Sequence, residues 1–164
     1  MTAARVLLAV AVVLVVVVYA FLASRWTSAE SAWYRSLPQP PWQPPDWVFG
    51  VIWPLNFGAL AIVGLGVALE GQLREAAGWL ALLVASVVLA LAWAHAFYLR
   101  HALGRAVGLL AGAAALTWGL LLVTSAILPW GSWVLLPYAV WLTVATSLAV
   151  GYWRLARPSR SAAR

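Results

Sequence analysis

Five apolar stretches, each long enough to cross a membrane as a helix, constrain this chain more than any other feature. They cover residues 6–24, 47–69, 76–99, 106–128 and 133–153. A helix needs roughly 20 apolar residues to span the hydrocarbon core of a bilayer. The links at 70–75 and 100–105 are short, and Leu128–Ser132 holds a proline–glycine turn, so neighbouring spans must run antiparallel. The sequence therefore predicts an all-α membrane protein, a five-transmembrane-helix bundle forming one domain over residues 1–164.

The composition supports this prediction and excludes several classes of function. Hydrophobic residues make up 65% of the chain and charged residues 9%, far from the balance of a soluble domain. The absence of cysteine excludes disulfides and thiolate metal sites. All ten basic residues are arginines, and most of them flank the apolar stretches. This placement predicts contact with membrane lipids and no nucleic-acid partner.

The arginines are divided unequally between the two faces that five spans would create. One face carries only Arg5 and Arg74, and the other carries Arg25, Arg35, Arg100, Arg105, Arg154, Arg157, Arg160 and Arg164. Cytoplasmic loops are rich in arginine and lysine. We therefore expect a multi-pass protein of a bacterial membrane, with an external N-terminus and a cytoplasmic basic tail at 154–164. A signal peptide is the alternative for the first stretch, although its apolar run exceeds the usual 7–15 residues.

The segment WYRSLPQPPWQPPDWVFGVIW, residues 33–53, interrupts the apolar pattern with five prolines. Proline fixes φ and restricts the preceding residue to extended conformations, so no helix is expected between Pro38 and Pro45. Asp46 is then a suitable N-cap for a helix starting at Trp47. The tryptophans here are typical of interfacial anchors, but Trp53 lies too far inside the second span for that role.

Aromatic and small residues share helical faces inside the spans. Trp53 and Phe57 are four residues apart, Ala90 precedes Trp93 and Phe97 on one face, and Trp141, Ala145 and Leu148 share another. Core packing explains such spacing. A pocket for a flat ligand between the rings is the alternative, since small-molecule sites are mostly apolar.

Three motifs resemble those of the TspO/MBR family, which contains tryptophan-rich sensory proteins and translocator proteins. Residues 33–53 match its signature through Trp33, Leu37, Trp42, Phe49 and Trp53, among others. WAHAFYL resembles a third-helix element through Trp93, Phe97 and Tyr98. LLPYAVWLTVATSLAVGYWRL resembles a fifth-helix element through Pro137, Tyr138, Trp141, Ala145 and Leu148.

The resemblance implies a five-helix bundle in which loop 25–46 covers a pocket. The ligands would be porphyrin, haem or sterol-like molecules, bound without any required cofactor by a sensor, carrier or regulator. The residues expected to bind the ligand are Trp33, Leu37, Trp42, Phe49, Trp53, Phe57, Ala90, Trp93, Phe97, Tyr138, Trp141, Ala145 and Leu148. The enzymatic alternative is light-dependent porphyrin breakdown, with Trp53 and Trp141 as candidate catalytic residues. A structural membrane module is a third alternative.

Several residues depart from the family pattern or allow a second interpretation. Ala90 and Ala149 replace asparagines of the family, which removes polar partners from the bundle interior. His95 is a candidate haem ligand, although hydrogen bonding to a neighbouring helix is the commoner role of such a histidine. Glycines 104, 108 and 112 permit close helix approach, either within the bundle or at a homodimer seam.

Overall fold

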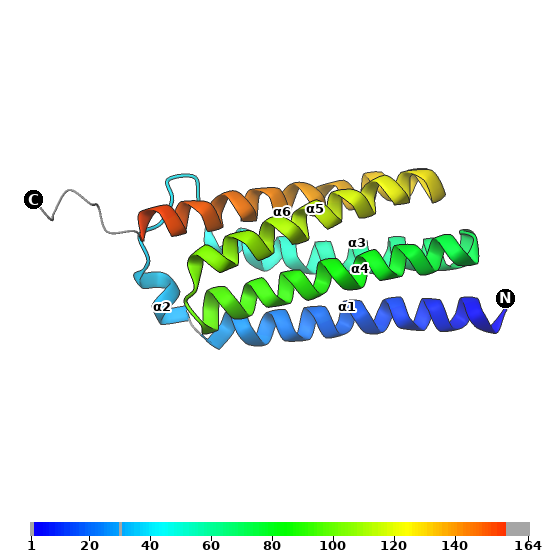
Figure 1. Ribbon diagram of the computed structural model, residues 1–164, viewed down its shortest axis with the longest axis horizontal. Coiled ribbons are helices and arrows are strands. Elements are labelled where there is room, and N and C mark those ends of the chain that lie inside the picture. Colours follow the sequence, from blue (N-terminus) through cyan, green and yellow to red (C-terminus); the bar gives the residue numbers. More distant parts are fainter. Residues whose placement is uncertain (1, 30, 157–164) are drawn as a thin grey trace, which may run out of the picture.

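The computed structural model describes residues 2–29 and 31–156, which form one bundle of long helices (Figure 1). The helices are α1 (Ala3–Ala29), α2 (Ser31–Ser36), α3 (Asp46–Glu70), α4 (Leu73–Ala94), α5 (Leu103–Ile127) and α6 (Pro129–Leu155). A π-helical turn, η1 (His95–Leu99), continues α4. Among the described residues there is no strand, and α1, α3, α4 with η1, α5 and α6 are each long and apolar enough to span a membrane. The predicted all-α, five-span architecture is confirmed.

The five long helices are arranged as a ring. α1 packs against α3 and α4, α5 packs between α4 and α6, and α6 closes the ring against α3. The described chain starts at one end of the bundle and finishes at the other (Figure 1). We call the end where α1, η1 and α6 finish the loop end; α2 and the proline-rich segment lie there.

Packing between the helices combines small residues with hydrogen bonds, as expected where lipid removes the hydrophobic drive for helix association. A Cβ added to Gly64 would lie 3.0 Å from the ring of Trp79, so α3 and α4 meet closely at this point. The Trp79 indole Nε1 donates to Thr124 Oγ1 at 2.7 Å, and the hydroxyls of Ser86 and Thr117 lie 2.9 Å apart. These bonds join α4 to α5 in the interior.

The N-terminus of α3 corrects one prediction. The helix begins at Asp46, with Pro45 as the N-cap residue, and no side chain makes a capping hydrogen bond. Pro45 has a φ of −57° and a ψ of 149°, so the extended backbone ends at Pro45, one residue earlier than expected. Asp46 therefore stabilises the helix through its charge in the first turn, near the positive end of the helix dipole.

Other helix boundaries also differ from the expected spans. α1 continues to Ala29 and α2 follows it, so much of the expected loop 25–46 is helical before the prolines begin at Pro38. α6 starts at Pro129, where proline is favoured in the first helical turn, so only Leu128 separates α5 from α6. Of the expected basic tail 154–164, residues 157–164 lie outside the described part of the chain.

Candidate ligand-binding cavity

Three adjoining compartments lie among α1, α3, α4 and α6 in the half of the bundle near the loop end. Thr27, Phe49 and Trp53 line all three. The outer compartment, beside α2, has a volume of about 390 Å³. The inner compartment, between the helices, holds about 50 Å³, and the lateral compartment, between α1 and α3, about 230 Å³. Together they form one candidate cavity.

Tryptophans from three helices meet at the inner compartment. The rings of Trp53 on α3 and Trp141 on α6 are perpendicular, with centroids 6.5 Å apart. Phe49 contacts Trp141 edge-on at 5.4 Å, and Trp93 lies 6.1 Å from Phe97. The indole Nε1 atoms of Trp93 and Trp141 are buried and have no hydrogen-bond partner in the described part of the chain. A buried donor without a partner is costly, so both atoms are suited to a ligand acceptor.

The lateral compartment lies where α1 and α3 present small residues to each other. Ala20 and Ala23 on α1 face Gly50 and Pro54 on α3. Pro54 has no N–H to donate to the carbonyl four residues earlier, that of Gly50, so the helix wall is weakened here. A Cβ at Gly50 would meet nothing within 4 Å. A side chain at position 50 would therefore extend into unfilled space.

Tyr19 closes the inner side of the lateral compartment. Its ring packs edge-on against Phe57 at 5.1 Å and against Trp53 at 6.3 Å. Its hydroxyl lies 3.3 Å from the hydroxyl of Tyr138 on α6. Tyr138 therefore acts on the cavity through Tyr19, and it does not line any of the three compartments.

The proline-rich segment, residues 37–45, docks on the end of α6. The hydroxyl of Tyr152 is hydrogen-bonded to the side-chain oxygen of Gln43 and, at 3.0 Å, to the hydroxyl of Tyr34 on α2. Pro40 is buried, and a Cβ added to Gly151 would lie 2.7 Å from Pro40 Cγ. Burial raises the pKa of the Tyr34 hydroxyl above its usual range. We call residues 37–45 the lid segment, after the role that the family resemblance implies, although none of them lines a compartment.

The structure brings most of the expected ligand-binding residues to the cavity. Those that line it are Phe49, Trp53, Phe57, Ala90, Trp93, Phe97, Trp141, Ala145 and Leu148.

Trp33, Leu37 and Trp42 lie elsewhere, as Tyr138 does. Trp33 stacks on His101 at 3.9 Å, and Leu37 packs in the same small apolar cluster at the loop end. Trp42 is 54% exposed and touches α6 near Gly151. These side chains pack α2 and the lid segment against the loop end and α6, and other residues form the walls of the cavity.

Sequence reasoning missed several residues that line the cavity: Tyr19, Thr27, Tyr34, Tyr98, Ala149 and Tyr152. A signal existed for Tyr152, because it continues the helical face that carries Trp141, Ala145 and Leu148. No comparable signal existed for Tyr19, since residues 6–24 are almost entirely apolar, or for Thr27, which fell in the expected loop 25–46.

The remaining candidates lie away from the cavity. His95, the candidate haem ligand, contacts Trp26 edge-on at 5.7 Å on the outside of the bundle. The described residues contain no group of three metal-binding side chains. In the glycine row, a Cβ at Gly104 would lie 2.9 Å from Trp153 Nε1, whereas a Cβ at Gly108 would meet nothing within 4 Å. Close helix approach therefore explains Gly104 and does not explain Gly108.

These features define an integral, multi-pass membrane protein with an aromatic cavity near one end. The TspO/MBR family model matches residues 9–154, and the chain belongs to that family. A curated translocator protein from Bos taurus is 30% identical over 153 residues, covering 88% of this chain and 87% of its own length. Protein CrtK of Rhodobacter capsulatus is 33% identical over 135 residues, covering 77% and 80%. A tryptophan-rich sensory protein of Cereibacter sphaeroides is 28% identical over 120 residues, covering 71% and 72%.

Proposed function

We propose that the protein binds a hydrophobic small molecule of the porphyrin or sterol-like class in this cavity, as a sensor, carrier or regulator. The observation that carries this proposal is the unpartnered indole N–H of Trp141, which lines the inner compartment beside Trp53. The names of the relatives, translocator and sensory protein, are consistent with a role of this kind.

The chemistry of the cavity favours a flat ligand with polar groups at its edge. Trp53, Trp141 and Phe49 offer aromatic faces and edges, and such contacts contribute about 0.5–1.5 kcal/mol each beyond burial. Arg35 lines the outer compartment and is suited to a carboxylate such as a porphyrin side chain.

The sizes of the compartments indicate where the ligand would lie. Small-molecule sites usually measure about 300–1,000 Å³, a size that the outer compartment reaches alone and the lateral one only together with it, whereas the inner one is far smaller. A ligand would therefore lie against Trp53, with its edge at the inner compartment that Trp141 also lines.

The proposed orientation puts the lid segment on the cytoplasmic side. Arginines of the described residues gather at the loop end, namely Arg25, Arg35, Arg100, Arg105 and Arg154, whereas Arg5 and Arg74 lie at the opposite end with Glu70 and Glu75. By the positive-inside rule the N-terminus is external. Reporter fusions at both termini test this orientation, and termini on the same side would contradict it.

Titration of the purified protein with protoporphyrin in darkness tests the binding proposal. We expect saturable quenching of tryptophan emission, because a bound porphyrin would lie against Trp53. Quenching that rises linearly with porphyrin concentration, as nonspecific partitioning into the detergent micelle would give, would contradict the proposal.

Light-dependent porphyrin breakdown is the second candidate. It is favoured by the closeness of two oxidisable indoles, those of Trp53 and Trp141, at the same cavity. Irradiating the saturated complex and following the porphyrin absorbance separates the two functions. If the absorbance of bound porphyrin falls no faster than that of free porphyrin in micelles, binding is the function that stands and breakdown is contradicted.

A further inference from the structure

A second depression lies on the outside of the bundle at the loop end, between α1, the α4–η1 junction and α5. Its volume is about 1020 Å³. It shares no lining residue with the three compartments of the candidate cavity. We call it the interfacial groove.

The interfacial groove has a charged rim and an apolar floor. Arg100 and Arg105 form the rim, and Ala92, Ala96, Gly108 and Leu109 form the floor. Arg105 lies in the first turn of α5, and Gly108 and Leu109 lie one turn further along the same helix, about 5 Å deeper in the bundle. The groove is therefore charged at the end of the bundle and apolar further in, just as a bilayer is charged at its headgroups and apolar in its core.

The turn between η1 and α5 brings the two arginines to the same rim. The chain reverses over Arg100–Ala102, and His101 has a positive φ of 52°. The N–H of Ala102 donates to the carbonyl of Ala96 at 2.9 Å, which fixes the turn. Both arginine side chains are exposed.

No acidic side chain among the described residues lines this rim. The described acids are Asp46, on α3, and Glu70 and Glu75, at the far end of the bundle. Two guanidinium groups on one rim are suited to bidentate hydrogen bonding with a phosphate.

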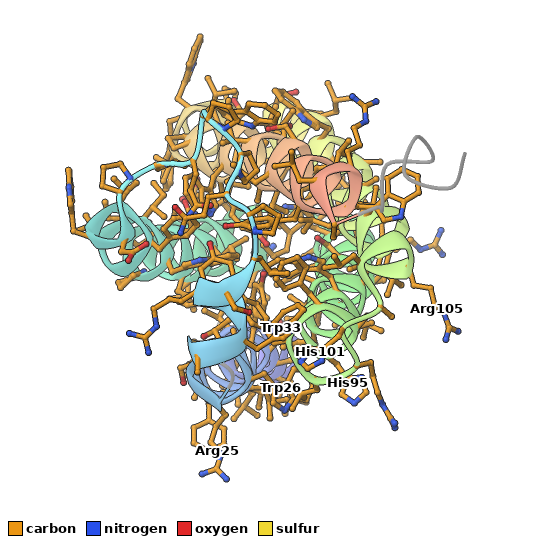
Figure 2. The ribbon with its side chains drawn as sticks, turned by 90° about the vertical axis from the view of Figure 1, so that its left-hand side faces the viewer. Arg25, Trp26, Trp33, His95, His101 and Arg105 are labelled. Atoms are coloured by element: carbon orange, nitrogen blue, oxygen red, sulfur yellow. The ribbon has the colours of Figure 1, made fainter. Side chains whose placement is uncertain are left out.

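Trp26 completes the groove from the α1 side. Its ring meets the imidazole of His95 edge-on at 5.7 Å, and both residues line the groove. Figure 2 shows Trp26, His95 and Arg105 on the same side of the loop end. Tryptophan is enriched at the headgroup level of membranes, which places the rim at the depth of lipid phosphates.

We propose that the interfacial groove is a binding site for one anionic phospholipid. Its phosphate lies between Arg100 and Arg105, and one acyl chain lies along the floor past Gly108. The open space at Gly108, where helix packing does not require glycine, is then the path of the chain. Basic pockets between membrane helices are known to hold anionic headgroups. This inference is independent of the ligand of the candidate cavity.

The first experiment blocks the floor. Full-length protein in detergent is titrated with phosphatidylglycerol or phosphatidylcholine, and bound lipids are counted by native mass spectrometry. We expect one phosphatidylglycerol per chain to be retained in preference to phosphatidylcholine. Gly108→Leu should weaken this binding on the order of tenfold, because the side chain fills the groove. Gly119→Leu is the matched control, since it lies on the same helix and a Cβ there also meets nothing within 4 Å.

The second experiment removes the rim charges. A basic residue near an anionic surface contributes roughly fivefold to lipid binding, so Arg100→Gln with Arg105→Gln should weaken phosphatidylglycerol binding about 30-fold. Arg25→Gln with Arg154→Gln removes two charges from the same end but none that line the groove, and should leave the retained lipid in place.

Equal retention of phosphatidylglycerol and phosphatidylcholine would overturn the proposal. So would an equal loss of phosphatidylglycerol binding in the two arginine double variants, or wild-type binding by Gly108→Leu. Full competition by soluble glycerol phosphate would also overturn it, because the apolar floor would then contribute nothing.

Discussion

Trp79 and Trp141 are both buried indoles in the same bundle, but their N–H groups have different surroundings. Trp79 Nε1 donates to Thr124 at 2.7 Å, and a Cβ on Gly64 would lie 3.0 Å from its ring. Trp141 Nε1 has no acceptor among the described residues, and its ring borders the inner compartment. The first tryptophan is fully accommodated by its own protein. The second has an unused donor and adjoining space, which is what a ligand-binding residue requires.

The same contrast separates the two halves of the bundle. In the half away from the loop end, the α3–α4 contact at Gly64 and the Trp79–Thr124 bond leave the interior filled. Near the loop end, aromatic rings meet edge-on around compartments, and the lid segment docks on the end of α6 beside them. The half away from the loop end is therefore expected to contribute most to stability, and the half near the loop end to contain the proposed binding site. Substitutions in each half test this division.

The largest effect is expected when Trp79 is truncated. Trp79→Ala should lower the free energy of unfolding by about 3–5 kcal/mol, because it leaves a cavity and removes the bond to Thr124. Thermal unfolding in detergent measures the change. Trp133→Ala, at a site 75% exposed, should change little. Equal losses in the two variants would show that the interior around Trp79 is not specifically packed.

The second effect concerns the docking of the lid segment on α6. Gly151→Ala places a Cβ 2.7 Å from Pro40 Cγ and 3.0 Å from the Trp42 ring, so the lid segment must shift. Overpacking of this kind costs about 1–3 kcal/mol, and we expect ligand release to accelerate on the order of tenfold. Stopped-flow fluorescence of bound porphyrin measures the rate.

Gly58→Ala is the control for the lid experiment, because a Cβ there meets nothing within 4 Å. Unchanged release from Gly151→Ala would mean that the lid segment does not limit ligand exit. The segment would then be an interfacial anchor, the alternative that its tryptophans suggest.

Much of the architecture was predictable from the sequence because membrane spans are encoded by simple length and apolarity. The ends of the helices were less predictable. Pro45, not Asp46, is the N-cap residue of α3, and α6 starts at Pro129 without the expected turn. In both places the backbone geometry of a proline sets the first residue of the helix. Hydropathy indicates that a span is present but does not locate its end to the residue.

The cavity was predictable only where a helix carries an aromatic pattern. The faces of α3, α4 and α6 could be assigned from spacing, whereas residues 6–24 are almost entirely apolar and hide the position of Tyr19, and Thr27 fell in the expected loop 25–46. Trp33 and Trp42 illustrate the opposite limit. Both belong to the family signature, yet they contact His101 and the end of α6, respectively, and line none of the compartments. A motif indicates that a residue matters without indicating which surface it contacts.

The smallest and most specific effect comes from replacing each of the two compared tryptophans with phenylalanine. Trp79→Phe should cost about 1 kcal/mol or more of stability, since Thr124 loses a buried hydrogen bond, and should leave porphyrin affinity unchanged. Trp141→Phe loses no bond within the protein, so its stability should be close to wild type. Its porphyrin affinity should fall by about 1 kcal/mol, the scale of one specific aromatic contact, and Trp53→Phe should behave in the same way.

Measuring both properties in both variants distinguishes a binding tryptophan from a structural one. Unfolding in detergent gives the stability, and dark titration with protoporphyrin gives the affinity. Ala145→Leu adds a steric version of the same experiment, because it fills the inner compartment beside Trp141 without altering an indole. It should weaken binding while Trp79 keeps its bond to Thr124. If Trp79→Phe weakened binding as much as Trp141→Phe did, the two ends of the bundle would be coupled, and an unpartnered N–H would no longer mark the ligand site.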